Sequence, residues 1–161
     1  MATVEERLAA LEAKVAALRA RDINEPAADG AFWALEALNE QFPEGTGAVV
    51  YAGVVRLEQS YRWQYGFTVD DLLGADWAEL VGGLTALAHP VRLQLLREIL
   101  GGRHGTAELA EIEGLGTTGQ LYHHLRQLTA AGWLRTSGRG QYAIPPERVV
   151  PLLAVLSAVR R

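Results

Sequence analysis

Residues 106–144 read TAELAEIEGLGTTGQLYHHLRQLTAAGWLRTSGRGQYAI, and this stretch decides the fold. Apolar residues at helical spacing predict a short helix that Thr106 can cap and a longer helix over 118–130 that Thr117 or Thr118 can cap. A Gly-Leu-Gly turn separates the two helices, which is the arrangement of a helix-turn-helix. The residues that follow predict two short strands, WLRT and QYAI, around the glycine-rich tip SGRG, and together these describe a small wing.

The longer helix has two unlike faces. Leu121, Leu125 and Leu128 recur at spacings of four and three, so we expect them to face the core. The opposite face is polar, with no acidic residue: Gly119, Gln120, Tyr122, His123, Arg126 and Gln127. Gln can form paired hydrogen bonds with adenine and Arg with guanine, and an α-helix fits the major groove of DNA. Arginines at a wing tip are favoured along the DNA backbone or in the minor groove. The sequence therefore predicts a duplex-DNA interface, with a merely solvated helix face as the alternative; its residues are Thr117, Thr118, Gln120, Tyr122, His123, Arg126, Arg135 and Arg139.

This half of the chain resembles the ArsR/SmtB-type winged helix-turn-helix regulators over about residues 80–161. The resemblance rests on LTALAHPVRLQLLREIL at 84–100, on the HHLRQL core of the longer helix and on the AGWL exit into the wing. It implies a homodimeric regulator, most simply a repressor, that binds a palindromic operator and responds to an effector. The metal-sensing role of that family does not transfer, because the chain has no cysteine and its last helix has no histidine, so we expect no metal site and no cofactor.

The last predicted helix, over 147–161, is apolar nearly all round. A single domain face cannot bury all of its large apolar residues, so a subunit contact is their natural use, and the resemblance implies the same. These residues are Val149, Val150, Leu152, Leu153, Val155, Leu156 and Val159.

The N-terminal half is predicted to add a coiled coil and an aromatic hairpin. Val4, Leu8, Leu11, Val15 and Leu18 are spaced as the a and d positions of a coiled coil, which indicates self-association, or else an amphipathic helix on its own domain. A helix over 31–42 and two strands over 48–57 and 61–69 follow. Four aromatic residues share one face of the second strand. We expect this face to pack on neighbouring helices; the alternative is that it lines an effector pocket for an apolar small molecule with the residues Tyr61, Trp63, Tyr65, Phe67 and Trp77.

The expected fold is therefore mainly α with a small β component. We expect a coiled-coil helix over 1–21, a helix and β-hairpin extension over 30–75, and a winged helix-turn-helix with a C-terminal dimer helix over 76–161. The formal net charge is −4, but residues 117–161 hold six basic side chains and one acidic one, so positive charge gathers near the predicted DNA interface.

The remaining sequence features limit the classes of function. No apolar run approaches the ~20 residues that cross a bilayer, and the N-terminus lacks the apolar core of a signal peptide, so we expect a cytoplasmic protein with no membrane partner. No catalytic motif is present, so we expect no enzyme activity. A protein-interaction or assembly module and an effector-sensing regulator stay open beside the DNA-binding regulator. A coiled coil at one end and a dimer helix at the other permit a dimer or a tetramer.

Overall fold

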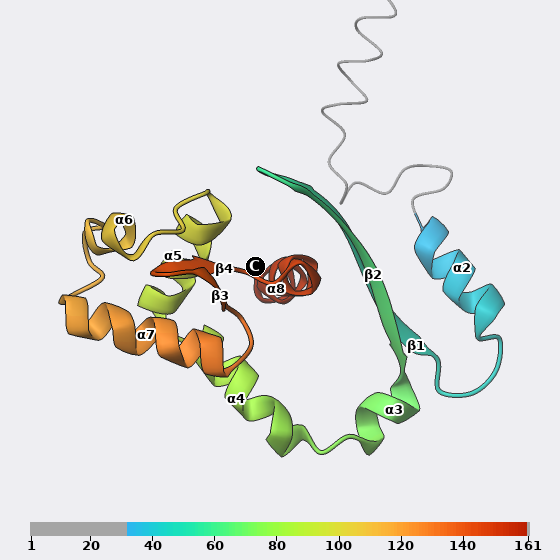
Figure 1. Cartoon of the computed structure of the whole chain (residues 1–161). Coiled ribbons are helices and arrows are strands. Elements are labelled where there is room, and N and C mark those ends of the chain that lie inside the picture. The colour runs from blue at the N-terminus through green and yellow to red at the C-terminus, as the bar shows by residue number, and fades with distance from the viewer. Residues whose placement is uncertain (1–31, 161) are drawn as a thin grey trace, which may run out of the picture. The chain divides into compact units, whose positions relative to one another are not determined.

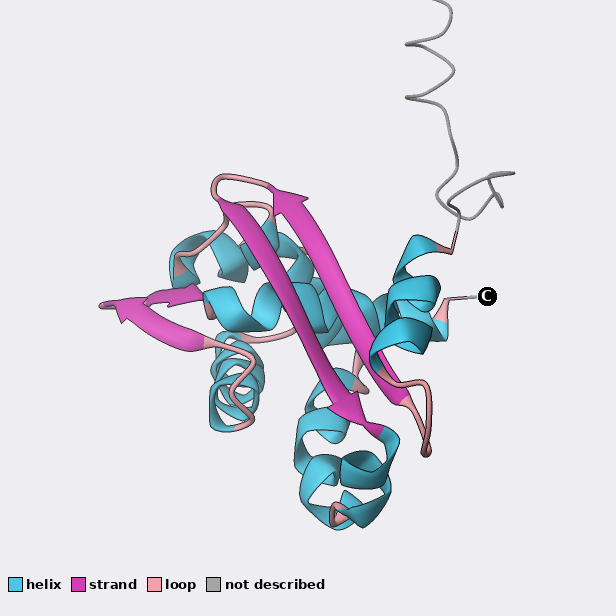
Figure 2. Cartoon of the chain, turned by 90° about the vertical axis from the view of Figure 1, so that its right-hand side faces the viewer, coloured by secondary structure: helices cyan, strands magenta, loops and turns pink. Residues whose placement is uncertain are grey.

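The computed structural model describes residues 32–160, so the predicted coiled coil over 1–21 lies outside the described residues. The described part is mixed α/β, with seven helices and two two-stranded antiparallel sheets (Figures 1 and 2). Every helix of this part is too short or too polar to span a bilayer. Residue contacts divide the chain after Gly47. The helix expected over 31–42 is α2 (Trp33–Gln41), which precedes that division.

The aromatic hairpin forms as the alternation of the sequence predicts. β1 (Ala48–Arg56) pairs with β2 (Ser60–Thr68), and the register places Tyr51 opposite Tyr65, Gly53 opposite Trp63 and Val55 opposite Tyr61, so all six share one face. Part of that face packs against α8 (Pro146–Val159), as Figure 1 shows.

The closest approach between the hairpin and α8 occurs at Gly53. A Cβ atom built on Gly53 would lie 2.8 Å from Val150 Cγ1, and Val150 is buried. The hairpin therefore belongs to the unit Ala48–Arg161, whereas the sequence placed it in a separate extension over 30–75. The hairpin covers an apolar side of α8, and this packing joins the two elements within that unit.

The packing of the hairpin also reduces the apolar surface of α8 that is exposed. Val149 and Leu152 lie in the main core, while Val150, on another side of the helix, is covered by the hairpin of the same chain. Part of the apolar surface that the sequence assigned to a subunit contact is thus buried within one chain.

The helices after the hairpin begin and end where local signals place them. Two separate helices follow the hairpin, α3 (Val69–Gly74) and α4 (Trp77–Leu87), because the Asp76 carboxylate accepts a hydrogen bond from Ala78 N at 2.9 Å and starts a new helix. α5 (Pro90–Leu100) starts at its proline and ends at Gly101. The remaining elements are α6 (Thr106–Ala110), α7 (Thr118–Ala130), β3 (Arg135–Gly138) and β4 (Gln141–Ala143).

One apolar core joins α5, α6, α7 and α8. Each helix contributes the side chains of a single face, as the helical period requires. The fully buried members of the core are Leu95, Leu96, Leu109, Leu121, Leu125, Leu128, Val149 and Leu152.

Candidate nucleic-acid interface

Three leucines hold α7 in place. Leu121, Leu125 and Leu128 are at most 1% exposed, which confirms the predicted inner face. Burying one leucine contributes about 2 kcal/mol, so the rotation of the helix about its axis is strongly determined. The opposite face must then point to solvent. Gln120, Tyr122, His123 and Arg126 are all exposed there; they are four of the eight residues predicted for the DNA interface.

The turn before α7 depends on two glycines. Gly114 and Gly116 have φ angles of +84° and +80°, which residues with a side chain rarely adopt. Leu115, between them, is buried in the core. The glycines thus allow a tight turn, and Leu115 anchors it between α6 and α7.

The start of α7 is closed by a reciprocal pair of hydrogen bonds. Thr117 Oγ1 accepts from Gln120 N at 3.4 Å, and Gln120 Oε1 accepts from Thr117 N at 2.8 Å. Thr117 is the cap, as predicted, and Thr118 is the first helical residue; both are exposed. The second bond was not predicted, although a Thr followed three residues later by Gln is its signal. Because its side-chain oxygen is engaged, Gln120 can contact adenine through both ends of its amide only if this cap opens.

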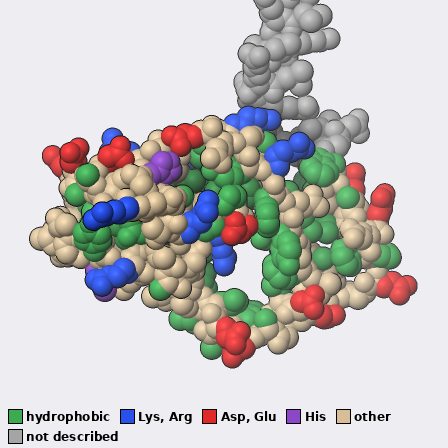
Figure 3. Space-filling model, viewed as in Figure 1, with side chains coloured by type: hydrophobic (Ala, Val, Ile, Leu, Met, Phe, Trp, Pro, Cys, Tyr) green, Lys and Arg blue, Asp and Glu red, His purple; other side chains and the backbone are tan. Residues whose placement is uncertain are grey.

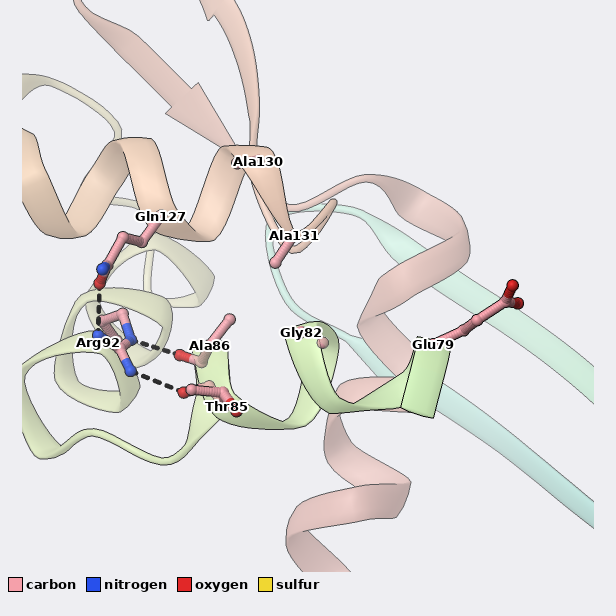
Figure 4. A pocket seen from close by; sticks show the side chains of 9 residues that line it. Glu79, Gly82, Thr85, Ala86, Arg92, Gln127, Ala130 and Ala131 are labelled. Atoms are coloured by element: carbon pink, nitrogen blue, oxygen red, sulfur yellow. Dashed lines mark hydrogen bonds between the residues drawn. The ribbon is translucent and has the colours of Figure 1, made fainter. Parts of the chain in front are cut away.

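A buried arginine links α7 to α4 (Figure 4). Arg92 of α5 donates to Ala86 O at 2.5 Å, to Thr85 O at 2.7 Å and to Gln127 Oε1 at 2.6 Å. The two carbonyls lie in the last turn of α4, where the helix dipole favours a cation. Gln127, which the sequence placed on the open face, therefore turns its side-chain oxygen toward Arg92. Nothing in the pattern of the sequence indicated this role of Arg92.

The residues around Arg92 also border a hollow. A cavity of about 630 Å³ lies between α4 and the C-terminal half of α7, and Gly82, Ala130 and Ala131 are among its lining residues. Small side chains on both helices leave this space open.

The two short strands predicted around the SGRG tip form as the antiparallel pair β3 and β4, and we keep the name wing for this pair and its tip. Arg135 pairs with Ala143 and Thr136 with Tyr142, and a register shift after Thr136 leads into the tip, where Gly140 has a φ angle of +67°. Arg135, on β3, and Arg139, at the tip, are both exposed. In both Figure 1 and Figure 2 the wing lies beside α7.

The wing is tied to the segment before α6. Tyr142 N donates to His104 O, and Thr106 N donates to Gly140 O, each at 2.9 Å. The expectation that Thr106 caps α6 is wrong: the cap is Gly105, whose N–H donates to the Glu108 carboxylate at 3.0 Å. The backbone N–H of Thr106 instead donates its hydrogen bond to Gly140 O in the wing, which holds the wing at a defined place relative to α6.

Charge separates along this half of the chain. Residues 114–146 contain no acidic side chain and include Arg126, Arg135 and Arg139. In Figure 3, acidic atoms gather at the upper left over α6, while a group of basic atoms lies lower, over α7. The exposed face of α7 and the wing therefore carries a local positive charge on a chain of negative net charge.

The two adjacent histidines of α7 differ. His123 is exposed, whereas the ring of His124 lies 4.7 Å from the ring of His89, and its Nδ1 atom is buried without a hydrogen-bond partner. Burial, followed by the charges of His89 and Arg92, lowers the pKa of His124. His124 therefore belongs to the inner side of the helix as a neutral ring. Among residues 32–160, no group of three or more histidine, aspartate or glutamate side chains is arranged to hold a metal ion.

The residues predicted for an effector pocket are only partly brought together. Tyr65 and Phe67 are in edge-to-face contact at 4.9 Å between ring centroids. Trp63 is exposed, and Trp77, on α4, donates its indole N–H to Leu72 O at 2.7 Å. Tyr61 is half-buried and lines a cavity of about 310 Å³, and none of the other four residues lines that cavity.

No protein-family model matches the chain, and none of the curated proteins does either.

Proposed function

We propose that the chain is a sequence-specific, DNA-binding transcriptional regulator in which residues 76–161 act as a winged helix-turn-helix. One observation carries this proposal: the face of α7 opposite its three buried leucines is exposed, free of acidic residues and adjacent to an arginine-bearing wing. A 13-residue helix is about 20 Å long, which is sufficient to lie in a major groove. The resemblance to ArsR/SmtB-type regulators favours repression as the outcome of binding.

The side chains of this surface divide into two kinds of contact. Arg126, in the middle of α7, suits a paired hydrogen bond to guanine O6 and N7. In the free chain its Nε–H donates to Tyr122 O at 3.3 Å. Tyr122 and His123 reach base edges or phosphates from the same face. Thr117 and Thr118 lie at the helix N-terminus, where exposed N–H groups and the helix dipole favour a phosphate.

The wing supplies contacts that depend less on sequence. Arg135 and Arg139 are exposed beside α7, and arginine is favoured along the DNA backbone and in a narrow minor groove. We expect these two residues to set affinity and salt dependence, while Arg126 sets base preference.

The test starts by selecting preferred duplexes from a random pool with the full-length chain at low salt. Arg126→Ala should weaken binding to the preferred duplex by about 10- to 100-fold and relax base choice at one position. Arg97→Ala is the matched control, because Arg97 lies on α5 with a side chain 82% exposed. It should change affinity less than about twofold. Arg139→Ala should weaken all duplexes evenly and reduce the salt slope by about one.

Two outcomes would overturn the proposal. The first is that the full-length chain binds no duplex of the pool at low salt. The second is that Arg126→Ala and Arg97→Ala weaken binding equally. Circular dichroism of both variants verifies that α7 is still folded.

We also propose effector sensing as a second function, favoured by the cavity that Tyr61 lines. His104 and the wing residue Arg135 line the same cavity, so a ligand there would touch both hairpin and wing. A compound that raises the melting temperature of the chain should lose this effect in Tyr61→Ala and keep it in Trp77→Ala. A panel of small aromatic compounds that leaves the melting temperature unchanged would count against this second function.

A further inference from the structure

The cavity of about 630 Å³ between α4 and the C-terminal half of α7 has no part in the contacts proposed for DNA. We call it the α4–α7 cavity. Its volume lies within the range of about 300–1,000 Å³ that is typical of small-molecule pockets. Small side chains form most of its wall: Gly82, Gly83, Ala86, Ala130 and Ala131. The cavity is therefore wide enough for a ligand, and most of its wall suits an apolar one.

One charged side chain of this wall is buried. Arg92 is only 7% exposed, and an arginine is almost never buried so deeply without an anionic partner. Among residues 32–160, however, no acidic side chain lies within 4.0 Å of its guanidinium. Its three hydrogen-bond acceptors are neutral oxygens, namely Ala86 O, Thr85 O and Gln127 Oε1. The α4–α7 cavity thus borders a buried cation that has no counter-charge in the described part of the chain.

These three acceptors leave both charge and hydrogen-bonding capacity unused. The carbonyls at the end of a helix carry the equivalent of about half a negative charge, so they balance only part of the charge of Arg92. A guanidinium has five N–H groups, and the three hydrogen bonds occupy three of them. One N–H group remains on each of Nη1 and Nη2. A carboxylate is the anion whose two oxygens match such a pair of donors.

We propose that the α4–α7 cavity binds a small organic carboxylate with an apolar body. The carboxylate accepts hydrogen bonds from Arg92, and the apolar body lies along Gly82, Ala130 and Ala131 (Figure 4). The acidic residue of the wall, Glu79, does not oppose this arrangement, because Figure 4 shows its side chain directed away from Arg92. Glu79 is also exposed, so solvent screens its charge.

An occupied cavity acts on α7 directly. The ligand touches Ala130 and Ala131 at the end of this helix, and it shares Arg92 with Gln127 of the same helix. Binding therefore biases the position of α7. This consequence, unlike the binding itself, rests on the proposed function: a ligand of the cavity should change the affinity of the chain for its preferred duplex.

Binding is tested on the full-length chain without DNA. The probes are cinnamate and octanoate, each compared with its neutral amide at constant ionic strength. The readout is the set of backbone amide NMR signals of Gly82, Ala130 and Ala131. At least one carboxylate should shift these signals to saturation, and its amide should bind about tenfold or more weakly, because only the carboxylate complements the charge of Arg92.

A pair of glycine variants tests the place of binding. Gly82→Leu fills the cavity, since a Cβ atom at Gly82 meets nothing within 4 Å and leucine favours a helix. Gly74→Leu is the matched control: Gly74 ends α3, also faces open space and does not line the cavity. Gly82→Leu should weaken carboxylate binding by about tenfold or more, and Gly74→Leu should change it by less than about twofold.

Arg92→Gln tests the role of the charge. This variant should weaken binding of the carboxylate but not of its amide. Because Arg92 is buried, the two glycine variants decide the matter if Arg92→Gln lacks the dispersed amide signals of a folded chain.

Three outcomes overturn the proposed ligand site. Neither carboxylate shifts the signals to saturation, or each carboxylate binds no more tightly than its amide, or Gly82→Leu binds as tightly as Gly74→Leu. The failure of this site is distinguishable from the failure of the proposed function, because a chain that binds duplex DNA but neither carboxylate refutes the ligand site alone.

The effect on DNA is measured separately. The carboxylate that binds should change the affinity for the preferred duplex by at least about twofold in the original chain and in Gly74→Leu, and should leave it unchanged in Gly82→Leu. An affinity that stays the same when the cavity of the original chain is saturated overturns the coupling to α7.

Discussion

Replacing Gly53 by alanine tests whether the hairpin is seated on α8. The new Cβ atom would lie 2.8 Å from Val150 Cγ1 and 3.3 Å from Val150 Cγ2. Carbon atoms prefer separations of about 3.5–4.0 Å, so the closer pair overlaps by most of an ångström. Val150 is buried and branched at Cβ, which leaves it few rotamers by which to move aside. The hairpin and α8 must therefore separate, or both must distort.

The expected loss of stability follows from two opposing contributions. Overpacking of this kind costs about 1–3 kcal/mol. Replacing glycine by alanine returns about 0.4–1 kcal/mol by restricting the unfolded chain. The net expectation for Gly53→Ala is a free energy of unfolding lower by about 1–2 kcal/mol, which shifts a urea midpoint by roughly 0.5–1 M.

The assay is urea unfolding followed by tryptophan fluorescence, with two comparisons. Ala52→Val is the matched control, since Ala52 is exposed on the other face of β1, and it should stay within about 0.5 kcal/mol of the original. Combining Gly53→Ala with Val150→Ala should recover at least about 1 kcal/mol relative to additivity, because the clashing methyl groups are gone. An unchanged midpoint for Gly53→Ala, together with a double-mutant cycle that shows no coupling, would refute the packing of β1 on α8.

Three further predictions concern the helices. Gly82→Ala should stabilise the chain by about 1 kcal/mol and raise its melting temperature by roughly 2–4 °C. The reason is that glycine is a poor helix former and that a Cβ atom at this position meets nothing within 4 Å. A lower melting temperature would contradict this prediction. Thr117→Ala should lower the free energy of unfolding by about 1 kcal/mol, because α7 loses its side-chain cap. Urea titration measures this change, and a variant as stable as the original would argue against the cap. Burial, and then the charges of His89 and Arg92, lower the pKa of His124, so the unfolded chain binds this proton more readily than the folded chain does. The contribution of the neutral His124 ring to the free energy of unfolding should therefore be fully present above a pH of about 6.5 and decrease as the pH falls below it. In unfolding curves measured across this range, His124→Asn should remove part of that decrease. The same pH dependence in both proteins would refute this prediction.

Local sequence signals predicted much of the candidate interface. The leucine spacing of α7 placed Gln120, His123 and Arg126 on its open face because an α-helix rotates by a constant angle per residue. The glycine-flanked tip predicted the wing for a similar reason, since few residues tolerate the backbone angles of a tight turn. Both inferences needed only residues that are close together along the chain.

Other features of the same surface depend on residues far apart in the sequence. The hydrogen bond from Arg92 to Gln127 joins positions 35 residues apart, and no local pattern indicates it. The bond from Thr106 N to Gly140 O, which replaces the predicted cap, joins α6 to the wing across a similar distance. Such contacts depend on how whole elements pack, which periodicity does not specify.

The spacing of residues along the chain fixes which residues of each element are apolar, where most helices begin and end, and which side of α7 stays polar. What covers each apolar face depends on how whole elements pack: the hairpin covers Val150 of α8, while the apolar residues from Leu73 to Leu84 stay exposed. The physical reason is that the period of a helix or strand sets the direction of its side chains, whereas burial requires a second surface. That surface comes from elsewhere in the chain, and several apolar faces compete for it.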